Sequence, residues 1–344
     1  MSWLPPDSED DDGDFAGWDE SDAKVRPNPK GNRPRTKIRP EHENAVEARV
    51  LSVDRGRYTV LVDDGGADEH VLLTKRAREL HNQAIVTGDV VDIVGDTSGD
   101  EGTLGRIVRI RPRETVLRRS ADDTDTVERV VVANADQLLI VIAAANPEPR
   151  PRLVDRYLVA AYDAGIAPLL VMTKTDLADP EPFLANFAGL GFPVFRSSPD
   201  HWPIDELAPA LAGHRTVAVG HSGVGKSTLV NELVPGTDRA VGSVNLVTGR
   251  GRHTSSSTVS LRVPTGGWII DTPGIRSFGL GHVDPANIIK AFPDLAAVAA
   301  DCPRGCTHLP DAPDCALNEA VERGELSAAR VDSLQRLLAT LGSS

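Results

Sequence analysis

The sequence feature that most constrains the fold is the segment GHSGVGKS at residues 220–227. It follows the apolar stretch RTVAV and opens the stretch KSTLVNELV, so it lies between a predicted strand and a predicted helix. It matches the pattern GxxxxGK[ST], in which glycines let successive backbone N–H groups point inward at phosphate oxygens. The alternative is a chance glycine-rich turn, and the strand–loop–helix setting argues against it. The segment therefore predicts a nucleotide-binding loop.

The side chains of this loop have distinct expected roles. We expect Lys226 to place its ammonium group on the β- and γ-phosphates and to act in catalysis, and Ser227 to offer its hydroxyl to Mg²⁺. The N-terminus of the helix adds a preference for anions. The predicted contacts to the nucleotide are Gly220, His221, Ser222, Gly223, Val224, Gly225, Lys226, Ser227 and Thr228.

A second motif, Thr173 to Asp176 (TKTD), indicates that the base is guanine. The Asp176 carboxylate can accept from both N1–H and the exocyclic N2–H₂ of guanine, whereas adenine presents an acceptor at N1 and would repel it. Lys174 is expected to lay its alkyl stem along the base. Ser197 and Ser198, at the end of the predicted strand FPVFRSS, can turn backbone N–H groups towards the guanine oxygen. TKxD is a weak signal alone, and a phosphate loop on the same sheet makes GTP or GDP the predicted ligand.

A third motif, DTPG, begins at Asp271 and ends at Gly274, after the apolar stretch WII. It fits DxxG, in which Asp271 holds Mg²⁺ through water and the Gly274 amide reaches the γ-phosphate. Between this motif and the phosphate loop lies GRGRHTSSST, which is unsuited to a regular helix. We expect this loop to place Thr254, or one of the serines after it, on Mg²⁺ only when the γ-phosphate is present. The sequence leaves open which hydroxyl does so.

The order of the motifs is rotated. Apolar strands and helical stretches alternate from about residue 130, which predicts an α/β domain with a mostly parallel sheet and helices on both faces. In an ordinary GTPase the phosphate loop comes first, whereas here TKTD precedes it, and no second NKxD-like segment follows residue 274. We therefore predict a circularly permuted P-loop G domain over residues 128–283. Because its switch segments then adjoin the flanking modules, nucleotide state is expected to reach both of them.

The N-terminal flank is predicted to be a tail and a small barrel. Residues 1–44 are acidic and then basic and proline-rich, typical of a disordered tail. Residues 45–118 hold about five short β-branched runs, which predicts an OB-like β-barrel. Tyr58 is its only aromatic candidate for base stacking, so a purely structural barrel is the alternative.

RNA contact has one candidate segment. The net charge of −13 means that RNA must be bound by a local basic patch. The candidate is the run GRIVRIRPRETVLRR, for which a charged strand face is the alternative. Its arginines are Arg106, Arg109, Arg111, Arg113, Arg118 and Arg119.

The C-terminal flank, residues 284–344, is predicted to be a small helical zinc-binding domain. Its candidate ligands are Cys302, Cys306, His308 and Cys315. Three sulfurs and one imidazole form a closed tetrahedral shell, which suits one structural Zn²⁺ rather than a catalytic one. Free thiols beside an unrelated histidine are the alternative. The chain shows neither an export signal nor an apolar run of membrane-spanning length, so a cytoplasmic protein without a membrane partner is expected.

The barrel, the motif order and the cysteine segment together resemble the RsgA (YjeQ) family of small-ribosomal-subunit biogenesis GTPases. The resemblance covers about residues 45–320, and its most specific segments are ANADQLLIVIAA, RLVDRYL, TKTD, GHSGVGKSTLVN, GRHTSSST, DTPGIRSFGL and the cysteine segment. Three positions depart from the family pattern. Thr173 stands where the family usually has Asn, His221 where glutamine or proline is common, and serines replace most of a threonine run. The cysteine spacing is also shifted by one residue.

The resemblance implies a monomeric GTP phosphohydrolase that binds the small ribosomal subunit and its rRNA, and that the ribosome stimulates late in subunit maturation. Ile275 stands where many GTPases carry a catalytic glutamine, so slow intrinsic hydrolysis is expected. By resemblance, His253 is the candidate that positions the attacking water, and a histidine without a catalytic part is the alternative. Two other readings are an ATP-using enzyme acting on RNA, which Asp176 argues against, and a non-catalytic RNA-binding scaffold, which the intact Lys226 argues against.

Overall fold

The computed structural model describes residues 42–80, 83–120, 128–236, 258–272, 278 and 280–342. Residues 1–41 of the predicted tail lie outside these ranges. So do four residues with predicted roles, which are His253, Thr254, Gly274 and Ile275.

A closed five-stranded barrel forms the first part of the described chain. Its strands are β1 (Val46–Asp54), β2 (Arg57–Val62), β3 (His70–Arg76), β4 (Val90–Val94) and β5 (Gly105–Ile110), with a short 3₁₀ helix η2 (Arg78–Leu80) after β3. The order is β1-β2-β3-β5-β4, and β4 pairs with β1 to close it. All neighbours are antiparallel except β3 and β5. Alternate strand residues such as Val50, Val60 and Ile93 are fully buried inside, as period-2 patterning requires. The predicted barrel is confirmed.

A two-stranded hairpin, β6 (Val116–Ser120) and β7 (Glu128–Ala133), follows the barrel. It pairs with the loop before β4 through an isolated bridge between Thr87 and Val132. Asn134, just after β7, donates through Nδ2 to the Gly88 carbonyl oxygen at 3.0 Å. The hairpin and Asn134 therefore fix the barrel to the start of the next domain.

A second group of strands forms the predicted parallel sheet. Its order is β10 (Val194–Arg196), β9 (Ala167–Thr173), β8 (Gln137–Ala143), β11 (Arg215–Val219), β13 (Trp268–Asp271) and β12 (Val259–Arg262). All neighbours are parallel except β12, which runs antiparallel to β13. At its first residue, β12 also pairs with β1 of the barrel. The parallel strands place their carboxyl ends, and so the predicted motifs, at one edge of the sheet.

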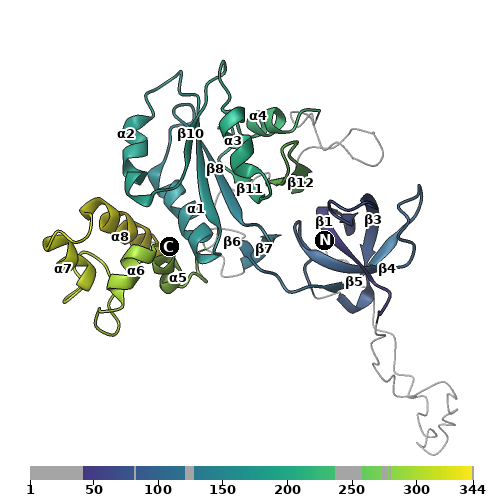
Figure 1. Ribbon diagram of the computed structural model, residues 1–344, viewed down its shortest axis with the longest axis horizontal. Coiled ribbons are helices and arrows are strands. Elements are labelled where there is room, and N and C mark those ends of the chain that lie inside the picture. The colour runs from purple at the N-terminus through teal and green to yellow at the C-terminus, as the bar shows by residue number, and fades with distance from the viewer. Residues whose placement is uncertain are drawn as a thin grey trace, which may run out of the picture. The chain divides into compact units, whose positions relative to one another are not determined.

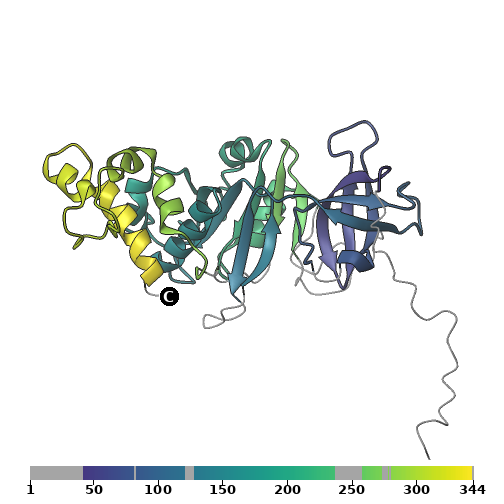
Figure 2. The ribbon, with the colours of Figure 1, turned by 90° about the horizontal axis from the view of Figure 1, so that it is seen from below.

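Helices cover both faces of this sheet (Figures 1 and 2). Every residue of β8 is buried, and its side chains alternate between two cores. Leu138 and Ile140 pack with α1 (Pro151–Asp163), whereas Leu139 and Val141 pack with α3 (Ile204–Leu211) and α4 (Lys226–Leu233). The short α2 (Glu181–Leu184) and the 3₁₀ helix η3 (Ala185–Leu190) precede β10. The predicted α/β class is confirmed.

Four C-terminal helices share the core of α1. They are α5 (Pro285–Lys290), α6 (Pro293–Ala299), α7 (Ala316–Glu322) and α8 (Ala328–Gly342). On α8, Arg336 donates through Nε to the buried Asp155 of α1 at 3.1 Å. Burial raises the pKa of the Asp155 carboxyl, and Arg336 offsets only part of that rise. None of the described helices is both long and apolar enough to cross a membrane.

Candidate functional site

The phosphate loop runs from the end of β11 to the start of α4, as predicted. Gly220 lies so close to β8 that a Cβ atom there would come within 2.4 Å of the Val141 carbonyl oxygen. Gly225 precedes α4 with a φ of 92°, which strongly favours glycine. No other described residue accepts a hydrogen bond from the backbone N–H groups of Gly225, Lys226 or Ser227. The loop therefore offers unused N–H donors at a helix N-terminus, which is an arrangement that binds anions.

Lys226 and Asp271 meet at the end of two neighbouring parallel strands. β11 pairs with β13 so that Ala218 lies opposite Asp271. The Lys226 ammonium donates to Asp271 Oδ1 and, at 3.0 Å, to the Thr272 carbonyl oxygen. The two charged side chains are only 11% and 7% exposed. The structure thus brings together the predicted phosphate-binding cation and the predicted magnesium carboxylate, which neutralise each other here.

Thr173 joins the TKTD motif to the phosphate loop. Its hydroxyl oxygen lies 2.5 Å from the Val224 carbonyl oxygen and 3.3 Å from that of Ile142. A hydroxyl has one proton, so it donates to the nearer carbonyl of Val224. Thr173 is 1% exposed, and β8 lies between its strand and β11. The two motifs therefore converge across the sheet. Threonine makes this link, although its side chain is shorter than that of the asparagine usual at this motif position.

Lys174 and Asp176 lie just past the end of β9. Lys174 adopts a positive φ of 55°, and its ammonium donates to the Asn146 carbonyl oxygen in the loop after β8. Asp176 is exposed, two residues beyond Lys174. Its carboxylate is therefore accessible at the same sheet edge as the phosphate loop. The Asn146 contact could not be predicted from the sequence, because a backbone acceptor carries no side-chain signature.

The loop after β10 is tied to the TKTD motif through Thr175. The backbone N–H and the hydroxyl of Thr175 donate to the Ser197 carbonyl oxygen at 3.1 and 3.0 Å. The backbone N–H groups of Ser197 and Ser198 already donate to the carbonyls of Met172 and His201, at 2.8 and 3.0 Å. The predicted contact to the guanine oxygen therefore requires one of these bonds to break. The Ser197 hydroxyl is buried and has no hydrogen-bond partner within the described ranges.

The four predicted zinc ligands come together between α6 and α7. The ligand atoms of Cys302, Cys306, His308 and Cys315 all lie within 4.8 Å of one another. Burial raises the pKa of the Cys302 thiol to about 11 and lowers the pKa of the His308 imidazole. Backbone N–H groups of Ala316 and His308 point at the sulfurs of Cys302 and Cys306, at 3.3 and 3.4 Å. Three thiols and one imidazole at this spacing fit a tetrahedral metal such as zinc.

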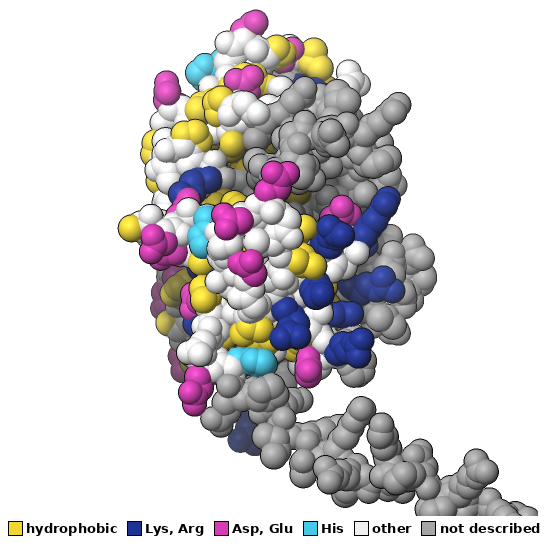
Figure 3. Space-filling view, turned by 90° about the vertical axis from the view of Figure 1, so that its right-hand side faces the viewer, with side chains coloured by type: hydrophobic (Ala, Val, Ile, Leu, Met, Phe, Trp, Pro, Cys, Tyr) yellow, Lys and Arg dark blue, Asp and Glu magenta, His cyan; other side chains and the backbone are white. Residues whose placement is uncertain are grey.

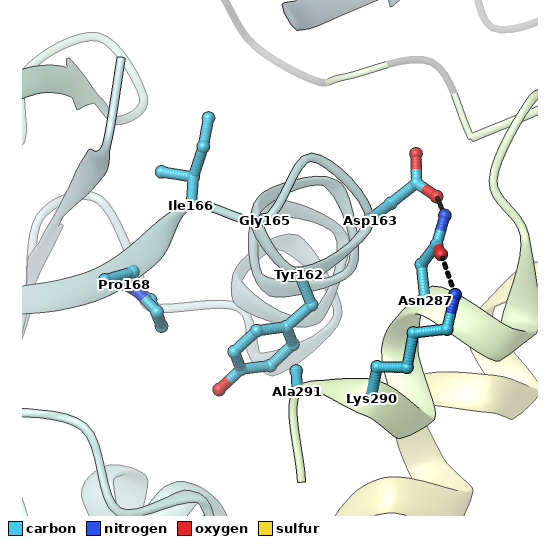
Figure 4. Close-up of a pocket in the computed structure, with 9 residues that line it drawn as sticks. Tyr162, Asp163, Gly165, Ile166, Pro168, Asn287, Lys290 and Ala291 are labelled. Carbon is cyan, nitrogen blue, oxygen red and sulfur yellow. Dashed lines mark hydrogen bonds between the residues drawn. The ribbon is translucent and has the colours of Figure 1, made fainter. Parts of the chain in front are cut away.

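One pocket lies at the opposite edge of the sheet (Figure 4). It has a volume of about 480 Å³ and lies between the start of β9, the end of α1 and α5. Tyr162 and Pro168 line it, and burial raises the pKa of Tyr162 to about 12. Beside them, Asn287 donates to Asp163 at 3.0 Å. Because the nucleotide motifs follow the carboxyl ends of the strands, this pocket is not part of the candidate site.

Three of the six arginines in the run predicted for RNA contact pair with carboxylates of the barrel. Arg113 pairs with the fully buried Asp89 at 2.7 Å, and Arg109 and Arg111 pair with Asp92 at 3.3 and 2.8 Å. These pairs fit the alternative of a charged strand face. Tyr58, the expected stacking platform, is 5% exposed and lies in the barrel core. It therefore cannot stack on a base.

Comparisons with known proteins point to one family. A family profile described as RsgA GTPase matches residues 110–281. Among curated relatives, "Small ribosomal subunit biogenesis GTPase RsgA" of Pseudomonas syringae pv. syringae is 42% identical over 266 residues, which is 75% of each chain. The protein of the same name from Pseudomonas aeruginosa strain LESB58 is 41% identical, over 75% of this chain and 76% of its own.

Solved structures agree with this assignment. YjeQ from Thermotoga maritima is 26% identical, with a TM-score of 0.64, and the match covers 87% of this chain and 99% of that one. YloQ, whose structure is titled a circularly permuted GTPase, matches with a TM-score of 0.62 over 88% and 97% of the two chains. At 22% identity the second match shows the fold alone. It confirms the predicted circular permutation, and the relatives and the profile together show that the chain belongs to the RsgA GTPase family.

Proposed function

We infer that this protein binds and hydrolyses GTP, and that the small ribosomal subunit stimulates it late in subunit maturation. The observation that carries the nucleotide part is the Thr173–Val224 hydrogen bond of 2.5 Å, which joins the base motif to the phosphate loop. The ribosomal part rests on family membership and on the names of the relatives. We place this activity in the cytoplasm, where such subunits are found.

The proposed division of roles follows the geometry. Asp176 and Lys174 recognise guanine, and the loop from Gly220 to Thr228 holds the phosphates. When the nucleotide arrives, Lys226 exchanges Asp271 for phosphate oxygens, because both acceptors are anionic and the phosphates carry more charge. That exchange separates Asp271 from Lys226, and Asp271 together with Ser227 would hold Mg²⁺. The metal would supply neutralisation of phosphate charge.

Turnover with and without purified small ribosomal subunits tests this function. We expect slow hydrolysis of GTP by the chain alone and a rate at least tenfold higher with subunits, because Ile275 cannot orient water. His253→Ala should abolish most of the stimulated rate, by roughly a hundredfold, while GDP affinity stays unchanged. An unstimulated wild-type chain would refute the ribosomal part, and an unchanged His253→Ala rate would end the proposal for His253 alone. His253 and Thr254 lie outside the described residues, so their roles remain predictions.

Each of the two segments with predicted switch roles is followed by a residue that contacts a neighbouring domain. The first such contact is with the barrel. Thr258, which follows the GRGRHTSSS segment, accepts a hydrogen bond from Thr87 of the barrel at 3.2 Å, and the next residue pairs with β1. At the other end of β12, Arg262 bonds Asp64 and Glu69 of the barrel at 2.8 and 2.5 Å. We propose that nucleotide state reaches the barrel through β12.

The C-terminal flank has its own anchor. Phe278 is fully buried against Tyr157 of α1, with ring centroids 5.7 Å apart, in the core that the C-terminal helices share. Hydrogen exchange with GDP and with a non-hydrolysable GTP analogue measures both routes. We expect β1, the 83–89 segment and α5 to change protection between the two states. Equal protection in both flanks would contradict the coupling.

A further inference from the structure

His70, the first residue of β3, lies between two carbonyl oxygens from different loops of the barrel. Its Nδ1 atom is 2.6 Å from the Asp68 carbonyl oxygen in the β2–β3 loop (63–69), and its Nε2 atom is 2.7 Å from the Thr97 carbonyl oxygen in the β4–β5 loop (95–104). A neutral imidazole carries one N–H and can donate to only one of these oxygens, whereas the imidazolium donates to both. The geometry therefore fits the charged form of His70.

The surroundings of the His70 ring also favour a positive charge. The two backbone hydrogen bonds raise the pKa of His70 above its usual value, burial opposes the rise, and the carboxylates of Asp68 and Asp63 add to it. Residues 63–69 and 95–104 together contain seven acidic residues and no lysine or arginine. At the barrel end of the molecule, a histidine side chain lies among Asp and Glu side chains, while Lys and Arg gather on the other side of that face (Figure 3).

The β4–β5 loop meets the ring with its backbone. A Cβ atom on Gly99 would come within 2.9 Å of the His70 ring carbon Cδ2, so the loop passes directly against the imidazole. The charged residues of this loop are Asp96, Asp100 and Glu101. The Asp96 carboxylate accepts from the backbone N–H and the hydroxyl of Ser98, at 3.1 and 2.7 Å. The His70 imidazolium is thus the cation that joins two acidic loops.

The β2–β3 loop also supplies the carboxylates that hold β12 of the G domain. Asp64 and Glu69 pair with Arg262 at 2.8 and 2.5 Å. Glu69 accepts a further hydrogen bond from the Gly65 N–H at 2.6 Å, so these ion pairs depend on how the loop is folded. In either neutral tautomer of His70, this loop loses its tie to the β4–β5 loop. The protonation of one imidazole therefore bears on a contact between the two domains.

We propose that protonated His70 is a latch that ties the β2–β3 loop to the β4–β5 loop and thereby keeps Asp64 and Glu69 on Arg262. The stabilisation by this latch is fully present below the ordinary histidine pKa of about 6.5, and it is lost as the pH rises through the raised pKa of His70. If nucleotide state reaches the barrel through β12, that coupling weakens over the same pH range. This last consequence rests on the proposed function, whereas the latch itself does not.

The test is a pH titration of the full chain labelled with 5-fluorotryptophan. The Arg262 guanidinium lies 4.8 Å above the Trp268 ring, so the fluorine resonance of Trp268 reports where Arg262 is held. Between about pH 6 and about pH 9 this resonance should shift in one step, with the same midpoint as the His70 ring followed by proton–carbon NMR. His70→Gln should lose the step completely, because one amide cannot replace both ring nitrogens. Its melting temperature should lie about 2 °C below that of the wild type at about pH 6, and this deficit should shrink towards about pH 9.

Two further variants separate the latch from other sources of a titration. The His214 carbonyl oxygen accepts from the Trp268 N–H at 2.7 Å, and His214 carries a titratable ring, so His214→Gln is the matched control and should leave the step intact. Arg262→Gln should remove the Trp268 step while the His70 ring still titrates. The proposal is overturned if the wild type shows no step, if the step survives His70→Gln or Arg262→Gln, or if His214→Gln abolishes it. None of these measurements needs GTP or ribosomal subunits, so a chain that subunits do not stimulate would count against the proposed function and leave the latch standing.

Discussion

Replacing Asp176 by asparagine should weaken GDP and GTP binding by roughly a hundred- to a thousandfold. The carboxylate can accept two hydrogen bonds from guanine, from N1–H and from the N2 amino group, and each bond to a charged group contributes about 1.5–3 kcal/mol. Asparagine keeps one acceptor and turns an NH₂ group towards a donor. A loss of about 3–4 kcal/mol corresponds to that change in affinity. Displacement of a fluorescent GDP analogue measures it.

The same substitution should create affinity for xanthosine diphosphate. Xanthine carries a carbonyl at C2 in place of the guanine amino group, so the asparagine NH₂ gains an acceptor and its oxygen keeps N1–H. The matched control is Asp205→Asn, an exposed carboxylate in the first turn of α3, which should change GDP affinity less than twofold. If Asp176→Asn binds GDP like the wild type, or prefers it to xanthosine diphosphate, the TKTD motif does not read the base.

The Thr173 contact helps to explain why we expect Asp176→Asn to cause a large loss of GDP affinity. Asp176 is exposed, so no packing fixes its carboxylate. The chain leading to it is held instead at two points, by the Thr173 bond to Val224 and, directly before Asp176, by the Thr175 bonds to Ser197. These bonds therefore set where the carboxylate leaves the backbone relative to the phosphate loop. The sequence placed these motifs on one sheet, but it could not show that threonine supplies the link.

The sequence predicted well those elements that are determined by residues close together in the chain. The glycine and lysine spacing at 220–227 determined the phosphate loop, because strand, turn and helix there are consecutive. The fully apolar β8 run indicated a strand buried on both faces, and it separates two cores. By contrast, β12 was missed. Val259–Arg262 has only four residues, and it is a strand because β13 and the barrel offer it partners.

The ion-pair partners of charged residues could likewise not be predicted from the sequence. Six arginines in one run suggested an RNA surface, but periodicity tells which face a side chain occupies and not what lies opposite. Asp89 and Asp92, some 20 residues earlier in the chain, engage three of the six.

Removing zinc should unfold the segment that joins α6 to α7 and lower the melting temperature of the full chain. Between Ala300 and Cys315 the main buried residue is Cys315 itself, so this loop has almost no apolar core to hold it. Structural zinc sites contribute on the order of 10 kcal/mol in small domains at neutral pH. Here Cys315 also begins α7, whose Leu317 is fully buried in the shared core. Loss of the metal should therefore spread into α7.

Metal content and thiol counting check this directly, since the chain has only three cysteines and all are predicted ligands. The native protein should hold one zinc per chain and show no reactive thiols, and chelation should release the metal and expose three. Cys315→Ser should behave like the chelated protein, whereas Asp311→Asn, a charge change in the same loop, should retain zinc. GDP affinity should survive in every case, because the nucleotide motifs lie at the carboxyl edge of the sheet and not in the C-terminal helices. If the zinc-loaded chain melts at the same temperature after chelation, the cluster does not stabilise the fold. If the native protein has three reactive thiols, the cluster holds no metal.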